Sequence, residues 1–339
     1  MKKHARTIEQ TSFLVTGGAG FIGSHIVEEL LQAGAKKVVA IDNFANGNWG
    51  NVNIFKHHPN YQFIEGDIRD AVFCKDVCSG IDAISHQAAL GSIPRSINDP
   101  ITTTEVNVNG FLNILVAAQQ HHIKRLVFAS SSSVYGSDAN LPKKEHRIGK
   151  PLSPYAITKL SNEHYARVFG QIHQLETIGL RYFNIFGPRQ NPKVAYAAVI
   201  PLFIEGLLQG TSVYINGKGD QTRDFTFVKN AARANVLALT TTQEKAYNQV
   251  FNVAVGERYS VLHLFESLAT ILNSAQQPIF LAPRQGDMAN SLADISKARR
   301  LLGYEPLVRF WEGLEQTVAY FVAQQSSHIP TASALSARS

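Results

Sequence analysis

A glycine-rich turn between an apolar segment and an amphipathic one limits the fold of this chain more than any other feature. The stretch LVTGGAGFIGSH places Gly17, Gly20 and Gly23 between a strand predicted at 12–17 and a helix predicted at 21–34. Because glycine has no side chain, backbone N–H groups at the helix N-terminus can approach a phosphate closely. Gly17 allows a tight turn, Gly20 allows phosphate contact, and Gly23 allows close packing of helix and strand. The turn therefore predicts a pyrophosphate site.

Asp42 extends this prediction from a pyrophosphate to a dinucleotide. It follows Gly23 by nineteen residues, at the end of the second predicted strand. A carboxylate at that place accepts hydrogen bonds from the adenosine ribose hydroxyls, and it repels a 2′-phosphate. We therefore expect NAD rather than NADP as the cofactor.

The first half of the chain alternates apolar runs with amphipathic stretches. Apolar strands that lack a polar face are typical of a parallel sheet covered on both sides. The pattern predicts an α/β fold: a Rossmann-type doubly wound parallel sheet with a smaller C-terminal α/β domain. Further strands are predicted at 36–42, 61–67, 81–89, 124–131 and 177–184, and further helices at 104–122 and 155–170.

The alternation becomes less regular after Asn184, where turn-rich and glycine-rich segments follow. We expect residues 1–183 to form the NAD-binding domain, with a segment at about 226–255 returning to it. Residues 184–330 are then the second, ligand-binding domain. Residues 331–339 are small and polar, and we expect a flexible tail there.

Composition and charge argue against several classes of function. With 45% hydrophobic and 17% charged residues, this 339-residue chain is typical of a globular protein. Its net charge of +6 is scattered, and no apolar run reaches the roughly 18 residues that span a bilayer. The N-terminal segment lacks the apolar stretch of a secretory signal, and Cys74 and Cys78 have no second pair with which to bind zinc. We expect a cytoplasmic protein without a metal, nucleic-acid or membrane partner.

Tyr155 and Lys159 lie four positions apart in a predicted helix that Ser153 and Pro154 are suited to begin. On a helix this spacing puts both side chains on one face, one turn apart. A free phenol has a pKa of about 10, so a tyrosine that acts as a base near neutrality needs a cation nearby. The serine cluster of the strand before the helix, at 130–136, would reach the same sheet edge and add a hydroxyl. The arrangement favours a catalytic pair.

Taken together, the Gly-x-x-Gly-x-x-Gly turn, SSSSVYG and Tyr155-x-x-x-Lys159 resemble the extended short-chain dehydrogenase/reductase family, over about residues 12 to 320. Within this family, nucleotide-sugar 4,6-dehydratases carry an Asp-Glu pair beside the catalytic hydroxyl residue, and UDP-glucuronate decarboxylases carry a Glu there. This chain has Ser131, Ser132 and Ser133 instead. The resemblance therefore implies a UDP-sugar 4-epimerase.

The resemblance also implies the residues of each site. Tyr155, Lys159, Ser131 and Ser132 are the expected catalytic residues. The residues expected to bind NAD are Gly17, Gly20, Phe21, Ile22, Gly23, Asp42, Asn43, Asn46, Gly47, Asp67, Ile68, Gln87, Ala88, Ala89, Asn107, Tyr155, Lys159 and Tyr182. Those expected to bind the UDP-sugar are Gly91, Ser92, Ser131, Ser132, Tyr155, Asn184, Ala198, Val199, Tyr214, Asn216, Arg223, Arg284, Asp287 and Ser291.

The implied reaction needs one proton shuttle and a reversible hydride transfer. Tyr155 takes the proton of the sugar 4-hydroxyl, directly or through Ser131, while hydride leaves C4 for NAD. The 4-keto sugar then turns over, and hydride returns to its other face. Arg223 and Arg284 suit the diphosphate because a guanidinium presents paired donors, and Asp287 can accept from ribose hydroxyls.

The substrate prediction rests on Ser291. Galactose-type epimerases that exclude N-acetylated sugars have a tyrosine in this stretch, and a serine leaves room for an acetamido group. QGDMANSLADISK and GSIPRS also resemble a bacterial subgroup that prefers UDP-N-acetylglucosamine and UDP-N-acetylgalactosamine. Alternatives are a UDP-glucuronate 4-epimerase, for which Arg95 could bind the carboxylate, a UDP-glucose 4-epimerase, and a non-catalytic NAD-binding sensor or scaffold. The resemblance also implies a homodimer, because relatives pair the helices that correspond to 104–122 and 155–170, and both segments carry apolar stripes here.

Overall fold

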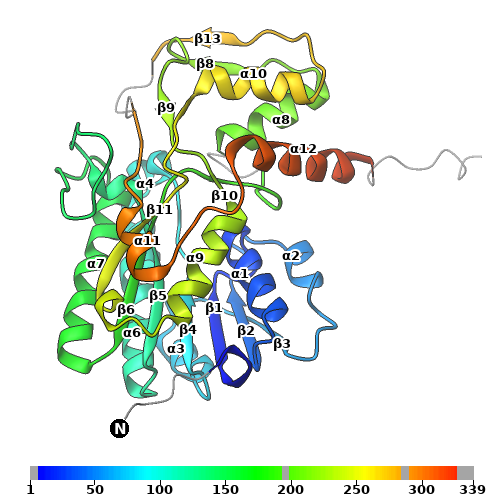
Figure 1. Ribbon diagram of the computed structural model, residues 1–339. Coiled ribbons are helices and arrows are strands. Elements are labelled where there is room, and N and C mark those ends of the chain that lie inside the picture. Colours follow the sequence, from blue (N-terminus) through cyan, green and yellow to red (C-terminus); the bar gives the residue numbers. More distant parts are fainter. Residues whose placement is uncertain (1–6, 193–197, 284–289, 327–339) are drawn as a thin grey trace, which may run out of the picture.

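A seven-stranded, wholly parallel sheet forms the centre of the molecule in the computed structural model, which describes residues 7–192, 198–283 and 290–326 (Figure 1). The strand order is β11-β6-β5-β4-β1-β2-β3. The strands are β1 (Ser12–Thr16), β2 (Lys37–Asp42), β3 (Tyr61–Glu65), β4 (Ala83–His86), β5 (Arg125–Ser131), β6 (Glu176–Tyr182) and β11 (Gln249–Val253). The predicted Rossmann-type fold class is confirmed.

Two apolar cores lie on the two faces of this sheet. On one face pack α1 (Phe21–Gln32), α9 (Val228–Thr240) and α11 (Ser296–Leu302). On the other pack α3 (Ala71–Val77), α6 (Gly110–Gln120) and α7 (Pro154–His173). Because both faces are covered, β1 and β4 are buried along their whole length, as their apolar sequences predicted.

The direction of winding reverses between β1 and β4. The chain leaves β1 for the face that carries α1, whereas it leaves β4 toward the face that carries α6. Loops that depart in opposite directions leave a crevice at the carboxyl ends of the strands, which is where ligands bind in such sheets.

The helix predicted at 104–122 has a more complex course. It consists of α5 (Pro100–Thr104), a π-helical turn (Glu105–Asn109) and α6. Such π turns often lie at functional sites. Here the turn contains Asn107, whose amide bonds to the backbone of Leu90 in the loop after β4. The strand predicted at 81–89 ends at His86, and the following residues form that loop instead.

The second lobe is built from short sheets around a third apolar core rich in phenylalanine. Its helices are α8 (Val199–Gln209), α10 (Val261–Ile271) and α12 (Phe310–Ser326). Its two-stranded sheets pair β7 (Ile185–Phe186) with β10 (Thr226–Phe227), β9 (Thr222–Arg223) with β12 (Tyr259–Ser260), and β8 (Tyr214–Asn216) with β13 (Ile279–Leu281). Figure 1 shows β8, β13 and α10 at the end of the molecule farthest from the central sheet.

The domain boundaries remain a prediction, but the structure shows how the chain crosses between the lobes. The segment 226–255 contains α9 and β11, which pack on the central sheet and extend it. Residues 331–339 lie outside the described residues. Two short helices, α2 (Trp49–Asn53) and α4 (Ile93–Asn98), were not predicted, and 3-10 turns occur at Ile8–Gln10, Ser132–Tyr135 and Glu244–Ala246. No helix in the described ranges is both long enough and apolar enough to cross a membrane.

Candidate active site

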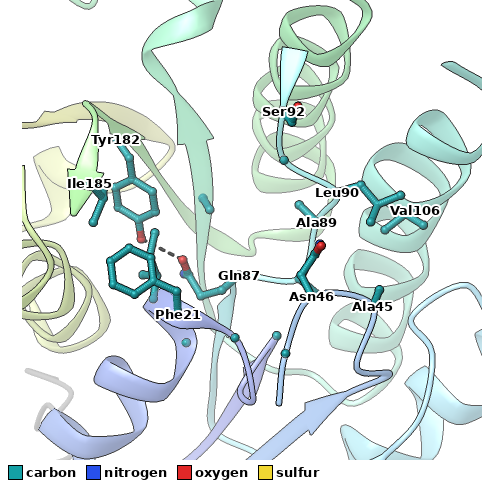
Figure 2. A pocket seen from close by; sticks show the side chains of 18 of the residues that line it. Phe21, Ala45, Asn46, Gln87, Ala89, Leu90, Ser92, Val106, Tyr182 and Ile185 are labelled. Carbon is teal, nitrogen blue, oxygen red and sulfur yellow. Dashed lines mark hydrogen bonds between the residues drawn. The ribbon is translucent and has the colours of Figure 1, made fainter. Parts of the chain in front are cut away.

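A cavity of about 560 Å³ opens at the carboxyl ends of the central strands. Figure 2 shows Phe21, Tyr182 and Ile185 along one side of it and Leu90, Val106 and Asn46 along the other. The cavity extends from the glycine turn after β1 to the ends of β5 and β6, so one space connects the predicted cofactor residues to the predicted catalytic ones.

The glycine turn has the geometry of a cradle that side chains would fill. Gly17 has a φ of +70°, and a Cβ atom there would lie 2.8 Å from the backbone nitrogen of Ala88. At Gly23 a Cβ atom would lie 2.1 Å from the carbonyl oxygen of Gly17. All three predicted glycines line the cavity, at the N-terminus of α1. The turn thus fits a dinucleotide pyrophosphate.

Asp42 both organises the turn and faces the cavity. Its carboxylate accepts hydrogen bonds from the backbone N–H groups of Ala19, at 3.1 Å, and Phe44, at 2.8 Å. Burial raises the pKa of Asp42, and the backbone hydrogen bonds oppose this shift. A carboxylate held in this way at the end of β2 can also accept from ribose hydroxyls, as the sequence predicted.

Asp67 and Asn107, two of the predicted cofactor residues, stand behind the cavity wall. Asp67 forms an ion pair with Arg69 at 2.7 Å, which holds the pKa of its carboxyl at about 2, and it accepts a hydrogen bond from Asn43. Asn107 is almost fully buried, and its amide holds both Leu90 and the hydroxyl of Thr158. Each therefore positions a cavity-lining neighbour. The other predicted cofactor residues line the cavity itself.

Tyr182 is held rigidly at the far end of the cofactor site. Its hydroxyl donates to Gln87 at 2.9 Å (Figure 2). The same hydroxyl accepts from the amide of Asn235 at 2.6 Å. Gln87 donates in turn to Ser85 and to Asn235. This closed network orients the aromatic ring, and burial raises the pKa of Tyr182, which keeps the phenol protonated.

Tyr155 and Lys159 lie together on α7, as the spacing predicted. The helix begins at Pro154, and the Ser153 hydroxyl caps it by accepting from the N–H of Ala156. The Lys159 ammonium lies 6.0 Å from the centre of the Tyr155 ring and donates to the carbonyl oxygen of Ala129 at 2.9 Å. Both side chains line the cavity.

Burial acts on both members of this pair and favours their neutral forms. It lowers the pKa of Lys159 to about 8 and raises the pKa of Tyr155, while the Ser131 hydroxyl beside the phenol lowers the latter. Burial therefore keeps the phenol protonated. A cationic ring bound next to it, together with the Lys159 charge, would favour the phenolate.

The serine strand delivers its hydroxyls to the same place. Ser131 ends β5, Ser132 begins the 3-10 turn that follows, and both line the cavity. The Ser131 oxygen accepts from the N–H of Ser133 at the start of this turn. Ser130 is anchored beneath them, because its hydroxyl donates to Glu163 at 2.5 Å. Glu163 is paired with the buried Arg181 at 2.8 Å, so the end of β5 is fixed from behind.

The predicted substrate residues divide into two groups. The first group lines the cavity: Gly91, Ser92, Ser131, Ser132, Tyr155, Asn184 and Ala198. The second group lies elsewhere in the second lobe: Val199, Tyr214, Asn216, Arg223 and Ser291. Arg284 and Asp287 lie outside the described residues. The cavity is thus lined by the predicted substrate residues of the first lobe together with Asn184 and Ala198.

Asp224 joins the segments of Arg223 and Ser291 to the residues that follow β11. Its carboxylate is fully buried and accepts hydrogen bonds from the backbone N–H groups of Val255, Gly256 and Ala293. Its carbonyl oxygen accepts from the Asn184 amide at 3.3 Å. Asp224 therefore ties the strand of Arg223 to the stretch that follows Ser291. Burial raises its pKa to about 7.

Sequence reasoning missed several residues that line the cavity. They are Ile41, Ala45, Gly66, Leu90, Val106, Ala129, Ser130, Ile185, Arg189, Gln190 and Asn191. Most are neighbours of predicted residues at strand ends, so extending each motif by one or two positions would have found them. Arg95 also lines the cavity, and the sequence suggested it only as a partner for a sugar carboxylate. Arg189 also ties its loop to α1, because it pairs with Glu28 at 2.7 Å.

Comparison with known proteins agrees with this geometry. Residues 13–254 match the model of the NAD dependent epimerase/dehydratase family. The UDP-N-acetylglucosamine 4-epimerase of Methanobrevibacter ruminantium, solved with UDP-N-acetylmuramic acid, is 40% identical with a TM-score of 0.87, over 93% of this chain and 99% of that one. The UDP-glucose 4-epimerase of Thermotoga maritima, solved with UDP-glucose, is 36% identical with a TM-score of 0.87, over the same shares.

A third solved structure contains the cofactor. The UDP-glucuronic acid 4-epimerase of Bacillus cereus, in complex with UDP-glucuronic acid and NAD, is 33% identical with a TM-score of 0.85, over 92% of this chain and 99% of that one. The glycine cradle, the placement of Asp42 and the Tyr155–Lys159 pair fit the same cofactor here. The chain therefore belongs to the NAD dependent epimerase/dehydratase family, and it is an isomerase whose cofactor is NAD.

Proposed function

We propose that this enzyme interconverts UDP-N-acetylglucosamine and UDP-N-acetylgalactosamine by epimerisation at C4 of the sugar. One observation carries the choice of reaction: among the described residues that line the cavity, Asp42 is the sole carboxylate, and it lies at the adenosine end. Elimination of water would require an acid beside the sugar, at the end of β5. Serines stand there, which is enough for hydride transfer with one proton shuttle.

Each catalytic side chain has a role that follows from its position. NAD, when bound, supplies a reversible hydride acceptor for C4. The Tyr155 phenolate takes the proton of the 4-hydroxyl, directly or through the neighbouring Ser131, and returns it after the 4-keto sugar has turned over. Lys159 is held by the carbonyl of Ala129, and its charge favours the phenolate.

The proposed preference for an acetylated substrate rests on a small side chain in the second lobe. Ser291 is buried beside β9, where its N–H donates to the carbonyl of Thr222, and its hydroxyl has no hydrogen-bond partner among the described residues. A tyrosine at this position would extend well beyond the serine. We therefore propose that the small side chain of Ser291 leaves space for the acetamido group.

Substrate profiling tests both parts of the proposal. We expect kcat/KM for the acetylated pair to exceed that for UDP-glucose and UDP-galactose, and Ser291→Tyr to reverse the order by lowering turnover of the acetylated pair alone. Ser291→Ala is the matched control, because it keeps the small volume. An equal or higher kcat/KM of the wild type for the plain pair would refute the acetylated assignment and leave the epimerase assignment intact.

UDP-glucuronate is the second candidate, supported by the likeness to the Bacillus cereus enzyme. Its carboxylate would need a cation at the sugar site. The guanidinium of Arg95 donates to Asn46, a residue of the cofactor side, which favours a different role for Arg95. Turnover of UDP-glucuronate above that of the acetylated pair would decide for this candidate. An enzyme that produces no C4 epimer from any UDP-sugar would favour a sensor or scaffold.

We also propose a homodimer that buries the outer faces of α6 and α7. Large apolar side chains on these helices are exposed: Val116, Ile157, Val168 and Ile172. A second copy of the chain would cover them with the same surface. Light scattering after gel filtration should give twice the chain mass of 37.3 kDa, and Ile157→Lys with Val168→Lys should give the monomer. A monomeric wild type would reject the dimer.

A further inference from the structure

Arg95 carries a positive charge into the cavity, and the catalytic scheme does not use it. Three cationic side chains line the cavity among the described residues: Arg95, Lys159 and Arg189. Lys159 is committed to the carbonyl of Ala129 beside the catalytic phenol, and Arg189 is paired with Glu28. Within the described ranges, Arg95 forms no ion pair, and its guanidinium has one hydrogen bond, to a neutral amide. Its charge is available to an anion in the cavity.

The strand order places Arg95 on one side of the glycine turn. β1 lies between β4 and β2 in the sheet, so the loops that follow β4 and β2 flank the turn that follows β1. Arg95 belongs to the β4 loop, on the short helix α4 that starts after Ser92. The Ser92 hydroxyl accepts from the Arg95 N–H at 3.3 Å and directs the start of this helix.

Asn46 lies on the opposite side, in the β2 loop, and this loop is fixed to the glycine turn. The N–H of Asn48 donates to the carbonyl of Ala19 at 3.2 Å, and the amide of Asn51 donates to the same oxygen at 2.8 Å. A Cβ atom at Gly47 would lie 2.9 Å from the Ala19 side chain, so the loop rests directly on the turn. Asn46 therefore has a defined place beside the pyrophosphate cradle.

One hydrogen bond joins the two sides. The Arg95 guanidinium donates to the Asn46 side-chain oxygen at 3.2 Å, and both residues line the cavity. Because this bond links the loops on either side of β1, the pair spans the cavity next to the glycine turn. The turn itself offers backbone N–H groups but no charged side chain, whereas a dinucleotide diphosphate carries two negative charges.

We propose that Arg95 and Asn46 form a clasp over the diphosphate of bound NAD and that this clasp retains the cofactor between turnovers. Asn46 orients the guanidinium, and the remaining donors of the guanidinium bind the diphosphate oxygens. An epimerase that returns its hydride in every cycle gains from a cofactor that stays bound. The inference rests on the NAD cofactor and is independent of which UDP-sugar reacts.

Cofactor retention is the direct test. Enzyme whose cofactor has been reduced to NADH is mixed with excess NAD, and the loss of bound NADH fluorescence gives the dissociation rate. We expect Arg95→Ala to dissociate roughly 10- to 100-fold faster, as follows from losing one or two charge-assisted hydrogen bonds. The dissociation rate of Arg95→Lys should lie between those of the wild type and Arg95→Ala, because lysine keeps the positive charge but lacks the paired donors of the guanidinium. Asn46→Ala should give a smaller increase, since the guanidinium remains.

A control variant and two further measurements distinguish a contact with the NAD diphosphate from a structural role of Arg95 and from a contact with the substrate. Arg233→Ala removes an exposed arginine on α9 and should leave the dissociation rate unchanged. The thermal unfolding of NAD-free Arg95→Ala should match that of the NAD-free wild type, which shows that the fold is intact. A dissociation rate within twofold of wild type would overturn the proposal. A higher KM for the UDP-sugar with unchanged NADH dissociation would also overturn it, by assigning Arg95 to the diphosphate of the substrate.

Discussion

The two halves of the active-site region are built in different ways. The cofactor half comes from the ends of adjacent parallel strands and the turns that follow them, so its residues are neighbours within short sequence motifs. The substrate half of the second lobe comes from two-stranded sheets and loops that meet only in the fold, with Asn184, Arg223 and Ser291 far apart in sequence. Asp224 joins them: its backbone carbonyl accepts from the amide of Asn184, and its buried carboxylate accepts from the N–H groups of Val255 and Ala293.

This difference indicates what each half can tolerate. In the cofactor half, backbone ladders hold the strands from which the cofactor residues follow, and a change in one side chain leaves these strands in place. In the substrate half, one side chain holds several segments together, so a single substitution can displace residues that it does not neighbour in sequence. The following predictions test this contrast, beginning with the largest effect.

Loss of the phenol should affect chemistry alone. Tyr155→Phe removes the proton acceptor while the ring still fills its place on α7, so we expect kcat to fall roughly 10³-fold, within the range of general acid–base catalysis. NAD content, measured by absorbance after denaturation, should match the wild type. Tyr165→Phe, an exposed position on the same helix, is the control. Turnover within threefold of wild type would remove Tyr155 from the mechanism.

A methyl group in the glycine turn should disable the cofactor half locally. In Gly23→Ala the new Cβ atom would meet the Gly17 carbonyl at 2.1 Å, so the turn must open. We expect NAD affinity to fall roughly 10- to 100-fold, from an overpacking cost of about 1–3 kcal/mol. Gly80→Ala has a positive φ but nothing within 4 Å, and should reduce stability without altering NAD affinity. Equal NAD affinity of Gly23→Ala and wild type would contradict the cradle geometry.

Asp224→Asn should weaken substrate binding without changing cofactor binding. The amide cannot accept all three backbone N–H groups, so the segments that carry Arg223 and Ser291 should loosen. We expect KM for the UDP-sugar to rise roughly tenfold, the effect of about 1.4 kcal/mol in lost hydrogen bonds, while NADH dissociation stays as in the wild type. Steady-state kinetics and the fluorescence chase measure the two quantities. A parallel loss of NAD binding would mean that the halves are coupled after all.

The pH dependence of stability should reveal the protonation of the Asp224 carboxyl. Burial raises the pKa of folded Asp224 to about 7, above its unfolded value, so its stabilising contribution is complete below about pH 4 and is lost as pH rises through 7. The free energy of unfolding of the wild type, relative to Asp224→Asn, should therefore decrease between pH 4 and 8. Urea unfolding at several pH values measures it. A constant difference would show that the carboxyl stays ionised throughout.

Much of the fold and the cofactor half could be predicted because their signals are local. The apolar strands and the glycine turn each lie within a few residues, and the parallel sheet follows from their alternation. The helix at 104–122 was predicted too regularly, because its π turn depends on the contact of Asn107 with the loop after β4. Helix periodicity contains no information about such a contact.

From the residues alone follow the α/β architecture, the glycine turn with Asp42 after the second strand, and the Tyr155–Lys159 pair on one helix face. These features depend on neighbours within one turn, one strand or one helix period. The fold adds that Asn107 supports a loop, that Asp224 holds segments distant in sequence and that Arg95 reaches Asn46 across β1. Each of those contacts joins residues distant in sequence, and packing alone brings them within hydrogen-bonding distance.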